Sequence, residues 1–231
     1  MKLIPFVSFK GGAGKTTALM AVASCLVARG ERVALFEADE NAPLARWRQN
    51  AITNETWSEQ VLLLPAASER DLERSYEKAE AEGCTYALAD TAGGGSELNT
   101  IAMTNAESIV IPTGLSVIDL DEALSTLAFA ANLFTQLNQP SPARMLFTRW
   151  PQGKLKAAEE ANISTIDGLP VFDAKLTERA AFADLKATGL LHAYRGHLAA
   201  TPSRRLLARH IELAIAEAEA LTDEILTTLP A

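Results

Sequence analysis

The residues best suited to chemistry lie near the start of the chain, in the run Lys10-Gly11-Gly12-Ala13-Gly14-Lys15-Thr16-Thr17. Its glycines admit backbone angles that are closed to other residues, and they leave room for a ligand beside the main chain. In a phosphate-binding loop, Lys15 would reach the β- and γ-phosphates of a nucleotide and the Thr16 hydroxyl would bind Mg²⁺. The residues expected to bind the nucleotide are Gly11, Gly12, Ala13, Gly14, Lys15, Thr16 and Thr17.

Two flanking elements must hold this loop in place. The apolar run from Leu3 to Phe9 predicts a buried strand, and apolar residues recur at helical spacing from Thr16 onward. A loop that leads into a helix gains the unpaired N–H groups and the partial positive charge of the helix N-terminus. A glycine turn that binds nothing is the alternative, and the order strand, loop, helix favours nucleotide binding over it.

Two later strands are expected to deliver carboxylates to the same place. One strand leads into Asp39, and another ends in Asp90 and is followed within two residues by three consecutive glycines. The carboxyl ends of parallel strands share one crevice, so both groups would face the phosphate-binding loop. We expect Asp90 to join Thr16 at the metal, through water, and the glycine loop to respond to the γ-phosphate. Simple solvation of a strand end is the alternative for Asp39.

The start of the loop departs from the general pattern G-x-x-x-x-G-K-[ST], because Phe9 stands where the first glycine is expected and Lys10 follows it. The run K-G-G-x-G-K-T-T resembles the deviant Walker motif of the ParA/MinD-type ATPases, and the resemblance covers about residues 1–190. It implies that Lys10 reaches across a dimer interface to the nucleotide of the partner subunit. It also implies that Asp39, which matches the second aspartate of the family's D-x-D segment, positions or activates the attacking water. The residues expected to act in catalysis are Lys10, Lys15 and Asp39.

Other parts of the chain carry the same resemblance. The stretches F-E-A-D-E-N-A-P-L-A-R-W-R, A-L-A-D-T-A-G-G-G-S-E-L-N and D-L-D-E-A-L-S-T look most like the branch that contains the ParA-like virulence protein of tumour-inducing plasmids, which acts in DNA transfer. Glu37 replaces the family's first aspartate, and its role is left open. Thr148-Arg149 stands where an asparagine often contacts adenine, so the base contact is left unassigned. The segment from Thr177 to Gly189 resembles a late family segment that lies near the base, and the helix after residue 112 resembles one that contributes to the dimer face.

Strands alternate with helices along almost the whole chain. This order predicts an α/β fold with a doubly wound, mostly parallel sheet and helices on both faces. A single domain is expected to span residues 1–231, with a C-terminal helical segment at about 202–226. The later strands are expected at 61–64, 86–90, 108–112, 143–148 and 169–173, and a helix is expected at 153–161.

Charge is distributed unevenly. The chain carries a formal net charge of −8, whereas residues 140–209 hold eleven Lys/Arg against six Asp/Glu. A basic region in an acidic chain predicts a local surface for DNA phosphates, with Arg204, Arg205 and Arg209 as candidates. Scattered solvated side chains are the alternative.

These features lead to one main hypothesis. We expect an ATP-dependent, dimerising partition or positioning ATPase that binds nonspecific DNA in its ATP state and moves a cargo, which could be a plasmid, a DNA-transfer complex or a protein cluster. Hydrolysis to ADP would be slow, Mg²⁺-dependent and stimulated by a cargo-bound protein. No uncharged apolar run reaches 18 residues, and the two cysteines lack metal-ligand spacing. A cytoplasmic protein, associated with the nucleoid in its ATP state and without a membrane partner, is therefore expected.

Two other hypotheses remain. A MinD-like membrane-cycling ATPase needs a basic amphipathic C-terminal helix, whereas every charged residue after Arg209 is acidic. A metabolic P-loop synthetase would use a similar loop to phosphorylate a carboxylate, but no substrate-pocket pattern is visible. An iron–sulfur reductase of related type requires paired cysteines in glycine loops, and Cys25 and Cys84 do not occupy such loops.

Overall fold

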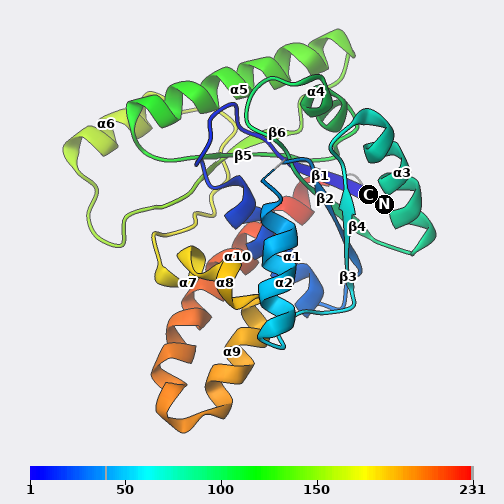
Figure 1. The fold of residues 1–231 in the computed structure, drawn as a ribbon. Coiled ribbons are helices and arrows are strands. Elements are labelled where there is room, and N and C mark those ends of the chain that lie inside the picture. Colours follow the sequence, from blue (N-terminus) through cyan, green and yellow to red (C-terminus); the bar gives the residue numbers. More distant parts are fainter. Residues whose placement is uncertain (40, 230–231) are drawn as a thin grey trace.

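A six-stranded sheet forms the centre of the protein, and the computed structural model describes residues 1–39 and 41–229. The strands run in the order β3-β2-β4-β1-β5-β6, and every pairing among the described strands is parallel (Figure 1). The expected doubly wound parallel sheet is therefore confirmed. The strands are β1 Lys2–Phe6, β2 Val33–Glu37, β3 Val61–Pro65, β4 Tyr86–Asp90, β5 Ile109–Thr113 and β6 Ala143–Phe147.

Both faces of the sheet are buried, which explains why its strands are almost continuous apolar runs. Alternate residues of each strand point to opposite faces. In β2, Leu35 faces one hydrophobic cluster and Phe36 faces another, and both side chains are fully buried. The register places Phe6 beside Asp90 and beside Val110, so the carboxyl ends of β4, β1 and β5 lie together.

Helices cover the two faces in separate groups (Figure 1). One group packs around α1, which is apolar on almost every side because other helices enclose it. That group contains α1 Lys15–Ala28, α2 Pro43–Thr53, α7 Ala180–Ala183, α8 Leu185–Thr188, α9 Leu191–Ala200 and α10 Arg205–Thr228. On the opposite face lie α3 Glu69–Ala81, α4 Glu97–Thr104 and α5 Val117–Gln136, while α6 Ala157–Ser164 contributes no buried residue.

Three expected elements differ from the structure. The strand expected from Leu3 to Phe9 ends at Phe6, and the next residues already lead into the loop. The segment 169–173 is not a strand, because it forms only a single parallel bridge, between Val171 and Met145. The next N–H groups leave the sheet edge and donate to the carboxylate of Glu224 instead. The helix expected at 153–161 begins only at Ala157, where the Lys156 N–H donates to the Glu159 carboxylate. Residues 153–156 approach this cap in an extended or turn conformation.

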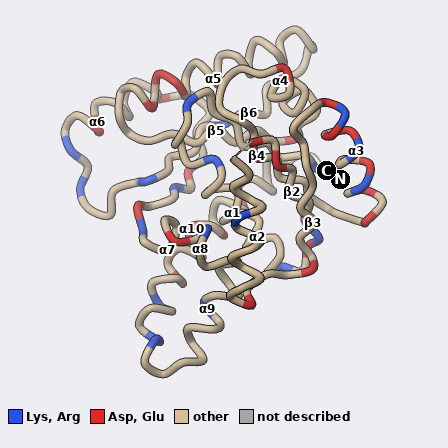
Figure 2. Tube along the Cα trace, in the orientation of Figure 1, with Lys and Arg blue, Asp and Glu red and all other residues tan. Residues whose placement is uncertain are grey.

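The C-terminal helical segment is longer than expected and is tied to the rest of the chain by its acidic side chains. A short 3₁₀ helix, Pro202–Arg204, leads into α10, and α9 packs against α10 as a projecting hairpin (Figure 1). The tube in Figure 2 shows blue Lys and Arg positions on the hairpin that α9 and the start of α10 form. The ion pairs of α10 are Glu212 with Arg195, Glu217 with Arg179, Glu219 with His192, Asp223 with Arg29 and Glu224 with Arg144.

These pairs change the interpretation of the basic region. Counting only described residues, four of its eleven cations have a carboxylate partner, namely Arg144, Arg149, Arg179 and Arg195. The residues with uncompensated positive charge are therefore fewer than the sequence suggests. None of the helices in the described ranges is long and apolar enough to cross a bilayer.

Candidate functional site

The P-loop, residues 10–17, connects β1 to α1 at the carboxyl edge of the sheet. Gly12 and Gly14 have φ angles of +82° and +97°, a conformation that costs other residues free energy. At Gly14 space is also limiting, because a Cβ atom there would lie 3.0 Å from the Thr148 hydroxyl. That hydroxyl donates to the Ala13 carbonyl at 2.9 Å, so the residue that follows β6 is hydrogen-bonded to the loop.

Lys15 lies at the start of α1 and is only 8% exposed. Burial lowers the pKa of Lys15 below its ordinary value, although the nearby carboxylates of Asp90 and Asp39 act in the opposite direction. An ammonium group that has lost most of its water is attracted strongly to a phosphate oxygen, because little hydration must be removed when the phosphate arrives. The structure therefore brings Lys15, Asp39 and Asp90 within electrostatic range of one another.

Thr16 and Asp90 are in direct contact, since the Thr16 hydroxyl donates to Asp90 Oδ2 at 2.7 Å. Asp90 is 1% exposed, and burial raises its pKa to about 6 against the hydrogen bond from Thr16 and the charge of Lys15. Its other oxygen, Oδ1, is buried and has no hydrogen-bond partner among residues 1–39 and 41–229. A hard divalent cation such as Mg²⁺ prefers oxygen ligands of this kind, held directly or through water. The residues present therefore fit a magnesium ion.

Glu37, the last residue of β2, and Asp39, which follows the strand, have different environments. Asp39 Oδ1 accepts hydrogen bonds from the Asn41 backbone and side chain, both at 2.9 Å. Glu37 Oε1 instead accepts from the backbone N–H groups of Leu44 at 2.6 Å and Ala45 at 3.2 Å. These N–H groups belong to the first turn of α2, where a carboxylate is stabilised by the helix dipole. Glu37 thus caps α2, a role that the sequence left open.

Lys10 forms an ion pair inside its own chain. Its Nζ lies 2.6 Å from Oδ1 of Asp119, a residue in the first turn of α5. Ser116 donates to the other Asp119 oxygen at 2.7 Å, and Arg149 lies 3.8 Å from it. Burial raises the pKa of Asp119, but the hydrogen bonds from Lys10 and Ser116 and the two cationic charges outweigh it, so the pKa lies below the ordinary value.

Phe9 adds a second link between the P-loop and α5. Its ring packs edge-on against Phe129, with the centroids 5.5 Å apart. Phe9 therefore has a packing function that glycine could not supply, which explains the departure from the general loop pattern. Neither Asp119 nor Phe129 was recognised from sequence as part of the site, because both lie more than 100 positions from the loop and carry no motif of their own.

The glycine loop after Asp90 is held by α4. The side-chain amide of Asn99, a fully buried residue, donates to the carbonyls of Ala92 at 3.1 Å and Gly94 at 2.5 Å. The expected response of this loop to a γ-phosphate stays a prediction, and Asn99 is the side chain that would have to follow the movement.

A cleft of about 250 Å³ opens beside the P-loop. We call it the P-loop cleft. One wall is formed by Gly12, Gly14, Thr17, Thr148 and Arg149. The opposite wall, which we call the facing segment, consists of residues 176–183 and contributes Leu176, Thr177, Glu178, Arg179, Phe182 and Ala183. The facing segment includes the start of the region expected near a base.

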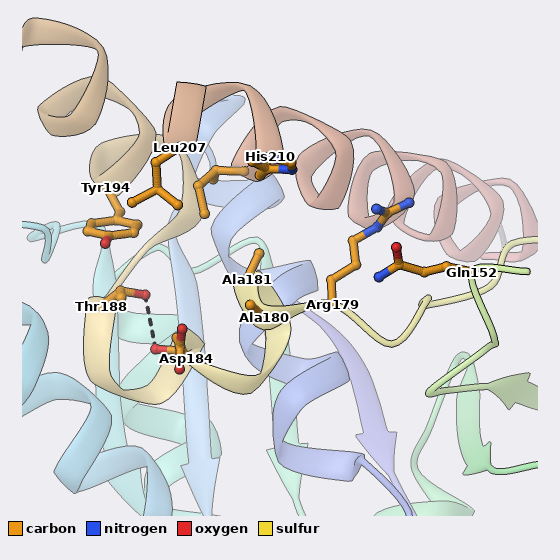
Figure 3. A pocket seen from close by; sticks show the side chains of 10 residues that line it. Gln152, Arg179, Ala180, Ala181, Asp184, Thr188, Tyr194, Leu207 and His210 are labelled. Atoms are coloured by element: carbon orange, nitrogen blue, oxygen red, sulfur yellow. Dashed lines mark hydrogen bonds between the residues drawn. The ribbon is translucent and has the colours of Figure 1, made fainter. Parts of the chain in front are cut away.

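A second cavity, of about 420 Å³, lies on the other side of α7 (Figure 3). It is bounded by the α7–α8 region and by the first turns of α10, from which Leu207 and His210 enter it. Arg179 borders both cavities. Because no residue of the P-loop lines the larger cavity, the arrangement of phosphate-binding groups belongs to the smaller one.

The candidate DNA-binding arginines are separated from the P-loop cleft. Arg204 ends the 3₁₀ helix, while Arg205 and Arg209 lie in the first turns of α10, and all three are exposed. They occupy the turn of the α9–α10 hairpin, which projects away from the sheet (Figure 1). The structure thus unites Lys10, Lys15, Thr16, Asp39 and Asp90 at one edge, and leaves the arginines on a different surface.

Comparisons with known proteins agree with this arrangement. A family model described as VirC1 protein matches residues 1–231. The VirC1 protein of Rhizobium rhizogenes is 44% identical over 217 residues, which cover 94% of each chain. Among solved structures, a plasmid partition protein of Borrelia burgdorferi bound to AMPPNP has a TM-score of 0.68 at 16% identity and covers 99% of each chain. A chain of the MinC:MinD cell division complex of Aquifex aeolicus gives a TM-score of 0.68 at 18% identity, covering 97% of this chain and 96% of the other. The chain therefore belongs to the VirC1 family, and its fold is that of the ParA/MinD-type P-loop ATPases.

Proposed function

We propose that this protein is a slow, Mg²⁺-dependent ATPase that dimerises with ATP and uses the cycle to position a cargo on DNA. The observation that carries the proposal is the contact between Thr16 and Asp90. The second carboxylate oxygen of Asp90 is buried near the buried Lys15 and has no hydrogen-bond partner in the part of the chain that the structure describes. An orphaned carboxylate oxygen and a desolvated ammonium group are both costly to maintain in a folded protein. A metal–nucleotide complex would satisfy both at once.

The chain's own groups divide the work of nucleotide binding. Backbone N–H groups of the P-loop and the N-terminus of α1 would surround the phosphates, while Lys15 would contact the β- and γ-phosphate oxygens. Thr16 would ligate Mg²⁺ directly and Asp90 would hold it through water. Mg²⁺ would supply positive charge against the phosphate oxygens. Base and ribose would occupy the P-loop cleft.

Hydrolysis would depend on Asp39 and on Lys10 from a second subunit. Asp39 lies within electrostatic range of Lys15 and Asp90, where it can orient a water molecule toward the γ-phosphate. Lys10 would leave Asp119 and contact the nucleotide of the partner subunit. Val117 and Ile118, at the start of the same helix as Asp119, are 57% and 67% exposed. A second subunit that docks at this end of α5 would cover apolar surface while it receives Lys10.

The DNA contact would be made by Arg204, Arg205 and Arg209, since the hairpin presents them together and no carboxylate within the described residues pairs with them. Contacts to phosphates carry no sequence information, so the binding would be nonspecific and sensitive to salt. The cargo would be a plasmid, a DNA-transfer complex or a protein cluster, and the likeness to a plasmid partition protein supports the first of these. A cargo-bound protein would stimulate hydrolysis and release the dimer from the nucleoid.

Size-exclusion chromatography with and without Mg·ATP tests the dimerisation cycle. Wild type should shift toward a dimer with ATP and return to a monomer as ADP accumulates. Lys15→Gln should remain monomeric because its side chain can no longer bind the phosphates, and Asp39→Ala should stay dimeric because it binds ATP without hydrolysing it. If all three proteins elute alike with ATP, the proposed cycle is wrong.

A further inference from the structure

Glu217, in the middle of α10, is surrounded by hydrogen-bond donors from one short stretch of chain. Its Oε2 accepts from the Thr177 backbone N–H at 2.8 Å. Its Oε1 accepts from the Thr177 hydroxyl at 2.7 Å and from Arg179 Nε and Nη2 at 2.8 and 2.5 Å. The Glu217 side chain is 19% exposed and that of Arg179 is 22% exposed, so these charge-assisted bonds are partly shielded from water.

The residues that Glu217 holds form a wall of the P-loop cleft. Thr177 and Arg179 both belong to the facing segment, opposite Gly12, Gly14 and Thr17. A further hydrogen bond to this wall comes from the β6 side, where the Glu178 N–H donates to the Trp150 carbonyl at 2.8 Å. Glu217 is thus the contact that fixes the segment from the α10 side.

Packing holds the apolar residues of the facing segment, because Leu176, Ala181 and Phe182 are buried in the hydrophobic cluster around α1. Thr177 and Arg179 are instead held by Glu217. The cavity of about 420 Å³ lies directly behind α7 and is bordered by Ala180 and Ala181, the residues that follow Arg179 (Figure 3). Figure 3 shows the Arg179 side chain extending from this stretch toward α10, with the cavity beside it. Beside this open space, the orientation of the Arg179 side chain depends on its charge-assisted hydrogen bonds to Glu217.

We propose that Glu217 is a positioning residue for the base and ribose of the nucleotide, which holds Thr177 and Arg179 in the conformation that completes the P-loop cleft. The inference rests on the proposed function, because it assumes that a nucleotide binds at the P-loop. It adds that binding has two separable parts. Phosphate binding depends on the P-loop alone, while binding of the nucleoside part depends on a helix that lies about 200 residues further along the chain.

The same helix offers a matched control. Glu224, seven residues after Glu217, accepts from the backbone N–H groups of Asp173 and Ala174, both at 2.9 Å. These two residues precede the facing segment and do not line the cleft. Glu224→Gln therefore weakens the same type of contact, between α10 and the segment that joins α6 to α7, without changing a contact to the wall of the cleft.

The test compares the affinities of ADP and of pyrophosphate, both with Mg²⁺, by isothermal titration calorimetry of wild type, Glu217→Gln and Glu224→Gln. Glu217→Gln should bind ADP about ten-fold more weakly, which is the effect expected from losing charge-assisted hydrogen bonds. Its affinity for pyrophosphate should stay within about two-fold of that of wild type. It should also lose part of its preference for ADP over GDP. Glu224→Gln should bind both ligands as wild type does.

Each outcome has a defined meaning. If Glu217→Gln binds ADP as tightly as wild type, or if ADP and pyrophosphate weaken together, the positioning role is wrong while the proposed function stands. If wild type binds neither ligand, the proposed function itself fails. Should Glu217→Gln not fold, Thr177→Val removes one of the same hydrogen bonds and should show the same selective loss for ADP in smaller measure.

Discussion

Lys10 Nζ lies 2.6 Å from Asp119 Oδ1, across 109 positions of sequence. The lysine that would act on a partner subunit is therefore neutralised within its own chain. The Lys10 side chain is 36% exposed, and ion pairs of this kind contribute about 1 kcal/mol or less. An interaction of this size can restrain Lys10 in the monomer and still be broken when a nucleotide phosphate becomes available.

Removing the charge of Asp119 should favour the dimer. In Asp119→Asn, Lys10 has no ionic partner at this position, so its release requires less free energy. We expect the dimer to form at about five-fold lower protein concentration in Mg·ATP, which corresponds to about 1 kcal/mol. Sedimentation velocity across a protein dilution series measures this shift. Asp121→Asn, on an exposed residue of the same helix, is the control. A weaker dimer in Asp119→Asn would contradict the restraining role.

The same carboxylate should make stability depend on pH. Its native pKa lies below the ordinary value, whereas in the unfolded chain Asp titrates at about 3.9. Ionised Asp119 therefore stabilises the native state above the unfolded pKa, and this stabilisation is lost as pH falls through the lower native pKa. Urea unfolding at pH 6 should give wild type an advantage over Asp119→Asn of about 1 kcal/mol or less. At a pH below the native pKa, the advantage should disappear; a constant difference would show that the ion pair is not its source.

Asp90→Asn should separate fold stability from metal binding. The carboxylate is buried, and one of its oxygens finds no hydrogen-bond partner in the described ranges. A neutral amide of the same shape should therefore raise the free energy of unfolding of the ligand-free protein by about 1–2 kcal/mol. The variant should also lose most of the stabilisation that Mg·ATP confers on wild type. Thermal unfolding with ADP, ATP and each nucleotide plus Mg²⁺ measures both effects. An Asp90→Asn protein that retains the full gain from Mg²⁺ would place the metal elsewhere.

The three hairpin arginines can be tested by charge removal. Replacing Arg204, Arg205 and Arg209 by alanine should weaken ATP-dependent binding to nonspecific duplex DNA. It should also flatten the slope of log K against log salt by about 0.9 for each DNA phosphate that the variant no longer neutralises. Fluorescence anisotropy at several salt concentrations gives both quantities. The triple variant Arg70→Ala, Arg74→Ala and Lys78→Ala, on exposed residues of α3, removes the same number of charges and is the control for net charge. Equal losses of affinity in the two proteins would mean that the hairpin is not the DNA surface, and ATP-dependent retention of wild type on anionic vesicles instead would point to a membrane.

The sequence by itself determined the features that are encoded locally. The apolar runs at 3–9 and 86–90, and the glycines that lead into Lys15 and Thr16, indicate a strand or a loop from a few neighbouring residues. The rule that parallel strands end at one edge then placed Asp39 and Asp90 beside the P-loop. The same local reasoning failed at 169–173, because a mostly apolar run does not reveal that the N–H groups of Asp173 and Ala174 donate to Glu224 and not to a neighbouring strand.

Tertiary structure decided which distant side chains complete the site. Asp119 meets Lys10, Glu37 caps α2, and Glu217 holds the wall of the P-loop cleft, yet none of these partners stands at a spacing that a motif could reveal. The physical reason is that charged side chains on a helix surface look alike in sequence, whether they face water or a buried donor. Only the packing of α5 and α10 onto the sheet determines which of them gain a partner and lose their hydration.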